Sequence, residues 1–208
     1  KDIALYLVGQ IGAAGALGRA VEFAGPVVRA MPMEGRFTLC NMAVEMGAAF
    51  ATIQPDDITF DYLKGRRYAP AGAAWDSAMA QWRLLKSDDD ARFDHEASID
   101  FTQVAPQVSW GISPQDVISV DGIVPDPAAE PDSQKRHAME AGLDHTGLTP
   151  GVPIEGTEID WVFIGSCTNN RISDLRAAAK IIEGHAVADN VTAWVVPGSL
   201  RIRAQAEE

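Results

Sequence analysis

The chain has 208 residues, which is enough for one large domain or two small ones with a hydrophobic core. A formal net charge of −12 argues against nucleic-acid binding, because phosphate recognition depends on clustered Lys and Arg. The chain contains no run of about 18 apolar residues, the length that a membrane-spanning helix needs. Its two cysteines lie far apart in sequence and do not indicate a disulfide framework. We therefore expect a protein of the reducing cytoplasm.

The first half of the chain predicts mainly helices. Apolar residues recur at helical spacing over residues 2–11, 38–50, 58–64 and 75–85. Glycines at positions 9, 12, 15 and 18 predict a helix exit and a turn. A phosphate-binding loop is disfavoured, because the spacing is not GxGxxG and no strand precedes it. Residues 20–24 then predict a short strand.

The pattern changes after residue 93, where residues 97–101, 107–110 and 117–120 predict short strands. Three prolines and three acids within residues 124–134 indicate a surface connection. This connection is the best candidate for a domain boundary, which would divide the chain into residues 1–124 and 125–208. A short helix over residues 135–142, stopped by Gly142, is predicted to follow.

The last fifty residues predict the most regular structure. Residues 159–166 and 191–196 have strand patterns, and a helix is predicted between them over residues 173–183. Such a βαβ unit predicts a parallel pair of strands and an α/β fold class. Cys167 and the segment 197–199 then lie just beyond the carboxyl ends of the two strands, where open α/β sheets bind ligands.

Cys167 has three interpretations on local chemistry alone. A small side chain packed in a tight turn is the commonest role for such a cysteine. A nucleophile would need a histidine base, and the four histidines show no relevant pattern. A metal thiolate would need further ligands, and the chain has neither a CxxC motif nor a His pair. Local chemistry therefore favours packing.

Asn41 and Glu45 are the only strongly polar residues of the helix predicted over residues 38–50, and their spacing of four places them on one face. They form either a solvated face or a polar site within an otherwise apolar helix. Arg171, in the turn after Cys167, is either ordinary surface charge or a group that binds a substrate carboxylate.

Two segments that contain these residues resemble characteristic segments of a known protein family. VFIGSCTNNRISDLRAAA resembles the first cluster-cysteine motif of the aconitase superfamily, and MEGRFTLCNMAVEMGA resembles its second characteristic segment. PDDITFDYLKGRRYAP, PQVSWGISP and VPGSLRIRAQAE are similar, in matching order, to segments of one branch, the large subunits of 3-isopropylmalate dehydratase. The similarity runs along essentially the whole chain.

The resemblance implies a hydro-lyase that isomerises 2-isopropylmalate to 3-isopropylmalate by dehydration and rehydration in leucine biosynthesis. It implies a [4Fe-4S] cluster held by three cysteines, whose fourth iron is open to the hydroxy-dicarboxylate substrate. Cys167 matches the first cluster ligand. Asn41 and Glu45 match residues near the open iron, with Glu45 as the hydrogen-bonding or acid/base partner. Asn169 and Arg171 lie in the cysteine turn, where we expect them to support the site and bind substrate.

The family pattern extends beyond these residues. The chain begins at Lys1 without Met and ends in the pattern of an early helix, so we expect a piece of a longer protein. The family's other two cluster cysteines belong to a downstream CxxC segment, and its general base comes from a swivelling domain, in this branch the small partner subunit. We expect one complete middle domain of an aconitase-like α/β/α fold, then the βαβ start of the cluster-binding domain.

The chain by itself is accordingly expected to hold no stable cluster and to be inactive. A homoaconitase-type hydro-lyase is the close alternative, because its pattern is shared. A non-catalytic scaffold piece of the same fold is a second alternative. An iron-regulated RNA-binding relative is disfavoured by the charge of −12.

Overall fold

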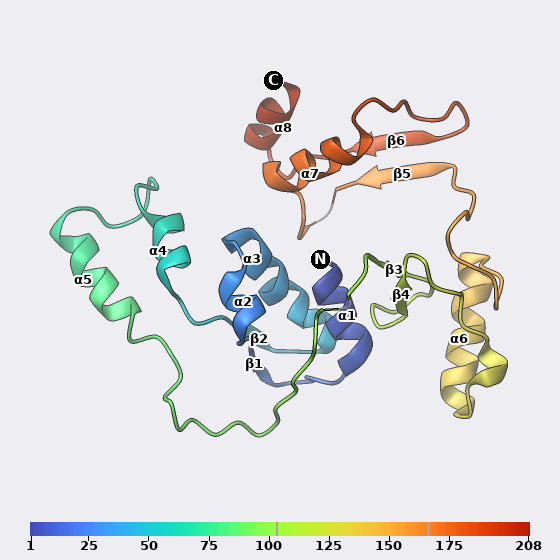
Figure 1. Cartoon of the computed structure of the whole chain (residues 1–208), viewed down its shortest axis with the longest axis horizontal. Helices are drawn as coiled ribbons and strands as arrows, with labels where there is room; N and C mark the ends of the chain where they lie inside the picture. Colours follow the sequence, from blue (N-terminus) through green and yellow to red (C-terminus); the bar gives the residue numbers. More distant parts are fainter. Residues whose placement is uncertain (103, 166) are drawn as a thin grey trace. The chain divides into compact units, whose positions relative to one another are not determined.

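Three two-stranded sheets and the helices around them form the part of the chain that the computed structural model describes, residues 1–102, 104–165 and 167–208 (Figure 1). The chain divides into two compact units. The N-terminal unit comprises residues 2–109 and 113–117, and the C-terminal unit comprises Lys1, residues 110–112 and residues 118–208. The mixture of helices with parallel strand pairs confirms the predicted α/β class.

The N-terminal unit is built around one short parallel sheet. Its elements are α1 (Asp2–Ile11), β1 (Ala20–Glu22), α2 (Pro26–Ala30), α3 (Met33–Met42), the 3₁₀ helix η1 (Ala43–Met46), β2 (Phe50–Thr52), α4 (Asp57–Leu63), α5 (Ala73–Trp82) and β3 (Gln107–Ser109). β1 and β2 pair in parallel, with Ala20 opposite Phe50 and Glu22 opposite Thr52. The helix predicted over residues 2–11 is confirmed by α1.

The hydrophobic core of this unit lies among α1, α3 and η1. Val8, in the middle of α1, is fully buried, and Leu39 and Met46 are almost so. Val21 of β1 and Ala51 of β2 pack against this cluster from the sheet. The core therefore holds the end of α3, which carries Asn41, and the following η1, which carries Glu45.

The helix predicted over residues 38–50 is wrong at both ends. α3 begins at Met33 and ends at Met42, η1 follows, and the chain leaves it at Gly47, whose φ of 81° is left-handed. A Cβ at Gly47 would lie 3.1 Å from Leu17 Cα, so the glycine also admits close packing. Phe50 is consequently exposed in β2, because pairing with β1 prevails over the helical pattern.

The strand predicted over residues 97–101 is also wrong, since this segment is irregular and joins no sheet. Ile99 and Phe101 instead pack against the core of the N-terminal unit. Their alternation with polar residues reflects burial of two apolar side chains and not backbone pairing.

The C-terminal unit contains a second parallel pair. Its elements are the 3₁₀ helix η2 (Pro127–Ala129), α6 (Ser133–Thr146), β5 (Trp161–Ile164), α7 (Ile172–Ile182), β6 (Thr192–Val195) and α8 (Leu200–Glu207). β5 and β6 are parallel, with Trp161 opposite Thr192 and Ile164 opposite Val195, which confirms the predicted βαβ unit. Residue 166, the predicted end of the first strand, lies outside the described residues.

One helix of this unit runs further than predicted. Gly142 does not stop α6, which continues to Thr146 and ends at Gly147 with a left-handed φ of 69°. A single glycine inside a helix costs only about 1 kcal/mol relative to alanine, so the flanking residues carry the helix through it. Asp132 begins α6 by accepting hydrogen bonds from the backbone N–H groups of Gln134 and Lys135 at 2.8 and 3.0 Å.

The chain passes from one unit to the other in the region of β3 and β4 (Val117–Ser119). Val124 is buried in the C-terminal unit, where its N–H donates to Val152 O at 2.9 Å. The backbone N–H of Gly151 donates to Val124 O, also at 2.9 Å. The domain boundary between residues 124 and 125 stays a prediction.

Candidate functional site

Cys167 lies in the turn that joins β5 to α7, three residues after the strand's last residue. Its thiol is free and exposed, and Sγ lies 3.7 Å from Thr168 Oγ1. An exposed thiol does not fit the packing role that local chemistry favours. The side chain is therefore accessible at the carboxyl edge of a parallel strand pair, where α/β sheets present their ligand-binding groups.

Asp174, in the first turn of α7, holds the residues that follow Cys167. Its Oδ1 accepts a hydrogen bond from Asn169 Nδ2 at 3.3 Å, and its Oδ2 accepts one from the backbone N–H of Arg171 at 2.9 Å. The guanidinium Nη1 of Arg171 is 3.8 Å from the same Oδ2. The structure thus brings Asn169 and Arg171 together on one carboxylate.

The sequence-based prediction missed Asp174. Asp174 lies three residues after Arg171, the N-cap of α7. An acid at this position is the second half of a capping box, and the spacing was the available signal. Arg171 occupies the position before α7, and its backbone N–H is the group that the acid reaches. The ordinary Ser or Thr of that motif is absent, because Arg171 stands in its place.

The loop after β6 lies directly against the Cys167 turn. The backbone N–H of Gly198 donates to Asn170 O at 3.1 Å, and a Cβ at Gly198 would lie only 2.8 Å from that oxygen. Ser199 Oγ then accepts a hydrogen bond from the backbone N–H of Ile202 at 3.2 Å, which caps α8. The two loops at the carboxyl ends of β5 and β6 therefore form one surface, and a side chain at Gly198 would separate them.

Asn41 and Glu45 belong to the N-terminal unit. Asn41 is exposed near the end of α3, and Glu45 is half-buried in η1. Between them, Met42 and Ala43 are buried in the core, so the backbone that carries both polar side chains is well anchored. The 3₁₀ geometry of η1 turns Glu45 further around the axis than a continuous α-helix would.

Cys40, one residue before Asn41, is a half-buried free thiol. Burial raises the pKa of the Cys40 thiol above its ordinary value. A thiol that is partly buried and less ionised reacts slowly and binds metal poorly. This environment fits a packing role for Cys40.

The predicted site residues therefore form two groups, each within its own unit: Asn41 and Glu45 in the first, and Cys167, Asn169 and Arg171 in the second. Among the described residues, no group of three or more His, Cys, Asp or Glu side chains is arranged to hold a metal ion. The exposed thiol of Cys167 fits the role of one ligand in a larger set.

Arg36 is a buried charged side chain that makes several hydrogen bonds, and its role was not predicted. It is only 3% exposed, and its two terminal nitrogens each donate to one oxygen of Asp56 at 2.7 Å. Arg36 also donates to the backbone oxygens of Met31 and Arg29 at 3.0 and 2.9 Å. The pair joins α3 to the start of α4, because Asp56 also caps α4 through the N–H of Thr59.

The hydrogen bonds from Arg36 lower the pKa of Asp56, and the partial burial of this carboxyl opposes them without cancelling their effect. An aspartate at a position suited to cap a helix was the available sequence signal for this pair. Their pairing across 20 positions could not be read from local spacing.

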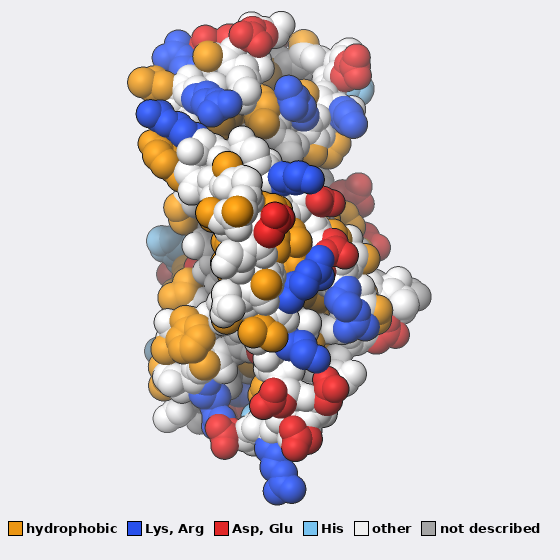
Figure 2. All heavy atoms as spheres, turned by 90° about the vertical axis from the view of Figure 1, so that its left-hand side faces the viewer, with side chains coloured by type: hydrophobic (Ala, Val, Ile, Leu, Met, Phe, Trp, Pro, Cys, Tyr) orange, Lys and Arg blue, Asp and Glu red, His pale blue; other side chains and the backbone are white. Residues whose placement is uncertain are grey.

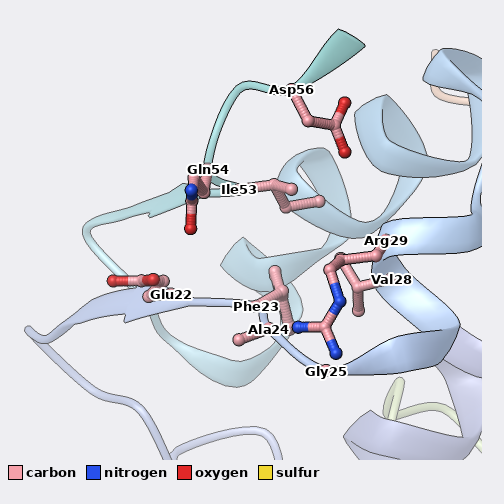
Figure 3. A pocket seen from close by; sticks show the side chains of 9 residues that line it. All are labelled: Glu22, Phe23, Ala24, Gly25, Val28, Arg29, Ile53, Gln54 and Asp56. Carbon is pink, nitrogen blue, oxygen red and sulfur yellow. The ribbon is translucent and has the colours of Figure 1, made fainter. Parts of the chain in front are cut away.

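A small pocket lies beside this ion pair, at the ends of β1 and β2 (Figure 3). Its lining includes Glu22, Phe23, Arg29, Ile53 and Asp56, and its volume is about 80 Å³. Sites for small-molecule substrates have volumes of about 300–1,000 Å³, so this hollow is too small for one.

The face of the molecule that carries α4 and α5 shows basic and acidic side chains interspersed (Figure 2). Arg83 and Asp57 form an exposed ion pair there, with 2.7 Å between Nη2 and Oδ1. Over the described ranges, no helix combines the length and apolar character needed to cross a lipid bilayer.

Similarity to known proteins covers the whole chain. A family model described as the aconitase family (aconitate hydratase) matches residues 1–208. The chain is 55% identical over 206 residues to 3-isopropylmalate dehydratase large subunit 1 of Bradyrhizobium diazoefficiens. The matched residues make up 99% of this chain and 43% of that protein. The chain thus spans less than half the length of this relative. Because the family model matches every residue, the chain belongs to the aconitase family.

Proposed function

We propose that this chain is part of the catalytic large subunit of a hydro-lyase that isomerises 2-isopropylmalate to 3-isopropylmalate in leucine biosynthesis. The observation that carries the proposal is the 55% identity over 206 residues to a large subunit with that name. In the reaction a C–O and a C–H bond break to release water and an alkene. Water then adds back with the hydroxyl and hydrogen on exchanged carbons.

In this proposal the complete subunit holds a [4Fe-4S] cluster through Cys167 and two further cysteines. The free, exposed thiol of Cys167 at the edge of the sheet supports this role, because thiolates are the usual ligands of iron–sulfur clusters. When bound, the cluster supplies an open iron that polarises the substrate's hydroxyl and carboxylate.

The remaining roles fall to polar side chains of the two units. Glu45 holds or moves a proton at the substrate hydroxyl, and Asn41 orients that hydroxyl by hydrogen bonding. Arg171 binds a substrate carboxylate, since a guanidinium matches a carboxylate with two parallel hydrogen bonds. Asn169 supports Arg171 through their shared partner Asp174.

The complete enzyme requires a small subunit, which supplies the swivelling domain and the general base. We place it in the cytoplasm, where cysteines that bind clusters stay reduced. We expect this chain alone to retain no stable cluster and to show no activity. Iron and sulfide analysis after anaerobic reconstitution measures this, and a full complement of iron on the isolated chain would contradict it.

The substrate is tested with the complete large subunit and its small partner. We expect kcat/KM for 2-isopropylmalate to exceed that for homoaconitate by about 100-fold, which is what an apolar pocket achieves between substrates of different side chains. Cys167→Ser should abolish cluster binding, while the matched variant Cys40→Ser should retain it. Equal use of both substrates would favour the homoaconitase-type alternative, and a wild-type subunit without iron would favour a scaffold.

A further inference from the structure

We propose that Asp174 is a positioning residue for Cys167, fixing the turn that presents its thiolate to the cluster. The inference concerns a residue that touches neither substrate nor cluster in the proposed chemistry, and its functional meaning rests on the proposed function. Its structural part, that one carboxylate orders the turn, stands on contacts within the C-terminal unit.

The two oxygens of Asp174 bind different parts of the chain. Oδ2 accepts the backbone N–H of Arg171, the residue before α7, at 2.9 Å. Oδ1 accepts the side-chain amide of Asn169, two residues after Cys167, at 3.3 Å. The first bond is an ordinary helix cap. The second reaches outside the helix into the turn, which capping alone does not require.

The surroundings make this carboxylate suited to such a role. Asp174 and Arg171 are each under one third exposed, and their charged groups approach to 3.8 Å. A negative charge in the first turn of α7 is also favoured by the partial positive charge at a helix start. Both carboxylate oxygens are thus placed to accept hydrogen bonds from the turn.

The consequence for Cys167 follows from preorganisation. A metal or cluster ligand that is fixed before binding loses less conformational freedom when the site forms. Groups that orient ligands from behind are worth about 10- to 100-fold in metal affinity in well-studied sites. Asp174 is placed to supply such an effect, because it bonds the backbone and side chain of the residues just after the thiolate.

The first test measures order in the turn, independently of any cluster. In the complete polypeptide freed of iron, hydrogen exchange of the Arg171 amide should accelerate about tenfold in Asp174→Ala, the loss expected for one hydrogen bond. The control Asp132→Ala removes an equivalent pair of capping bonds from α6 in the same unit. It should leave exchange at residues 167–171 unchanged.

The second test measures the cluster. After anaerobic reconstitution, Asp174→Ala should need about tenfold more iron and sulfide for half-loading, and the electron paramagnetic resonance spectrum of the cluster should change. Asp174→Asn should rescue both, because the introduced amide keeps one oxygen for the Arg171 N–H while Asn169 can turn its own oxygen toward the new NH₂ group.

The outcomes are separable. If Asp174→Ala and Asp132→Ala behave alike in exchange and in loading, Asp174 is an ordinary cap and the proposal is overturned. Failure of Asp174→Asn to rescue would also overturn it, since charge would then matter and not the hydrogen bonds. If the wild-type polypeptide takes up no iron, the proposed function fails, while the exchange measurement still decides whether Asp174 orders the turn.

Discussion

The sheet of the N-terminal unit packs on a buried apolar core, whereas the sheet β5–β6 of the C-terminal unit leaves large apolar side chains exposed. In the N-terminal unit, α1, α3 and η1 enclose a core in which Val8 is fully buried. In the C-terminal unit, Trp161 of β5 is 59% exposed and Trp194 of β6 is 53% exposed. Their rings meet edge to face, with 4.7 Å between the ring centroids. A parallel sheet is stable when helices or strands cover both faces. The second sheet therefore needs more partners than the residues described provide.

The largest expected contrast comes from one substitution made in each unit. Leu39→Ala removes a side chain that is 3% exposed and should lower the free energy of unfolding by about 2–5 kcal/mol. Leu200→Ala removes one that is 84% exposed and should change it by less than about 0.5 kcal/mol. Urea unfolding followed by circular dichroism measures both. Similar losses at the two positions would show that the C-terminal unit is closed by contacts that the structure lacks.

The next contrast concerns two ion pairs that start at neighbouring residues. Asp56→Ala leaves the buried Arg36 guanidinium without its carboxylate, and we expect a loss of about 3 kcal/mol in unfolding free energy. Asp57→Ala breaks the exposed pair with Arg83 and should cost at most about 1 kcal/mol. Equal losses of unfolding free energy in the two variants would mean that the burial of Arg36 does not strengthen its pair with Asp56.

The same pair gives the N-terminal unit a pH dependence. The pKa of Asp56 is lower in the folded chain than in the unfolded one, chiefly because of the hydrogen bonds from Arg36. Its contribution to stability is therefore complete above the unfolded pKa of about 3.9 and is lost as the pH falls through the lower folded pKa. The acid unfolding curve should lose this component in Asp56→Ala. An unchanged difference between wild type and variant from pH 7 to pH 2 would refute it.

The smallest expected contrast is between the two thiols. Cys167 is exposed, whereas Cys40 is half-buried with a raised pKa. Because alkylation proceeds through the accessible thiolate, Cys167 should react with iodoacetamide about tenfold faster than Cys40 at pH 7.5. Mass spectrometry of timed samples gives both rates, and Cys40→Ser isolates the faster one. Preferential modification of Cys40 would count against the placement of Cys167.

Much of the local structure could be predicted from the residues because it depends on near neighbours. Helical spacing gave α1, and the strand–helix–strand pattern gave β5, α7 and β6 with their parallel pairing. The predicted helix over residues 38–50 failed where Gly47 ends η1 and β2 pairs with β1. That strand pairing joins residues thirty positions apart, which the local pattern does not contain.

The candidate site divides in the same way. The position of Cys167 after a strand could be predicted, and its family motif suggested a ligand role. The contacts around it could not, because they depend on how Asp174 and the loop at Gly198 meet the turn. Arg36 precedes the helix predicted over residues 38–50, and no role could be assigned to it until its partner Asp56 was located.

By itself, the sequence determined the types of most elements, the place of Cys167 beyond β5 and the resemblance to the aconitase superfamily, because periodicity and motif spacing are local properties. Only the tertiary structure decided that Arg36 and Asp56 form a buried pair, that Asp174 holds Asn169 and Arg171, and that Gly142 lies inside a helix. These features depend on which side chains meet after packing, and packing selects among partners that the local sequence leaves equivalent.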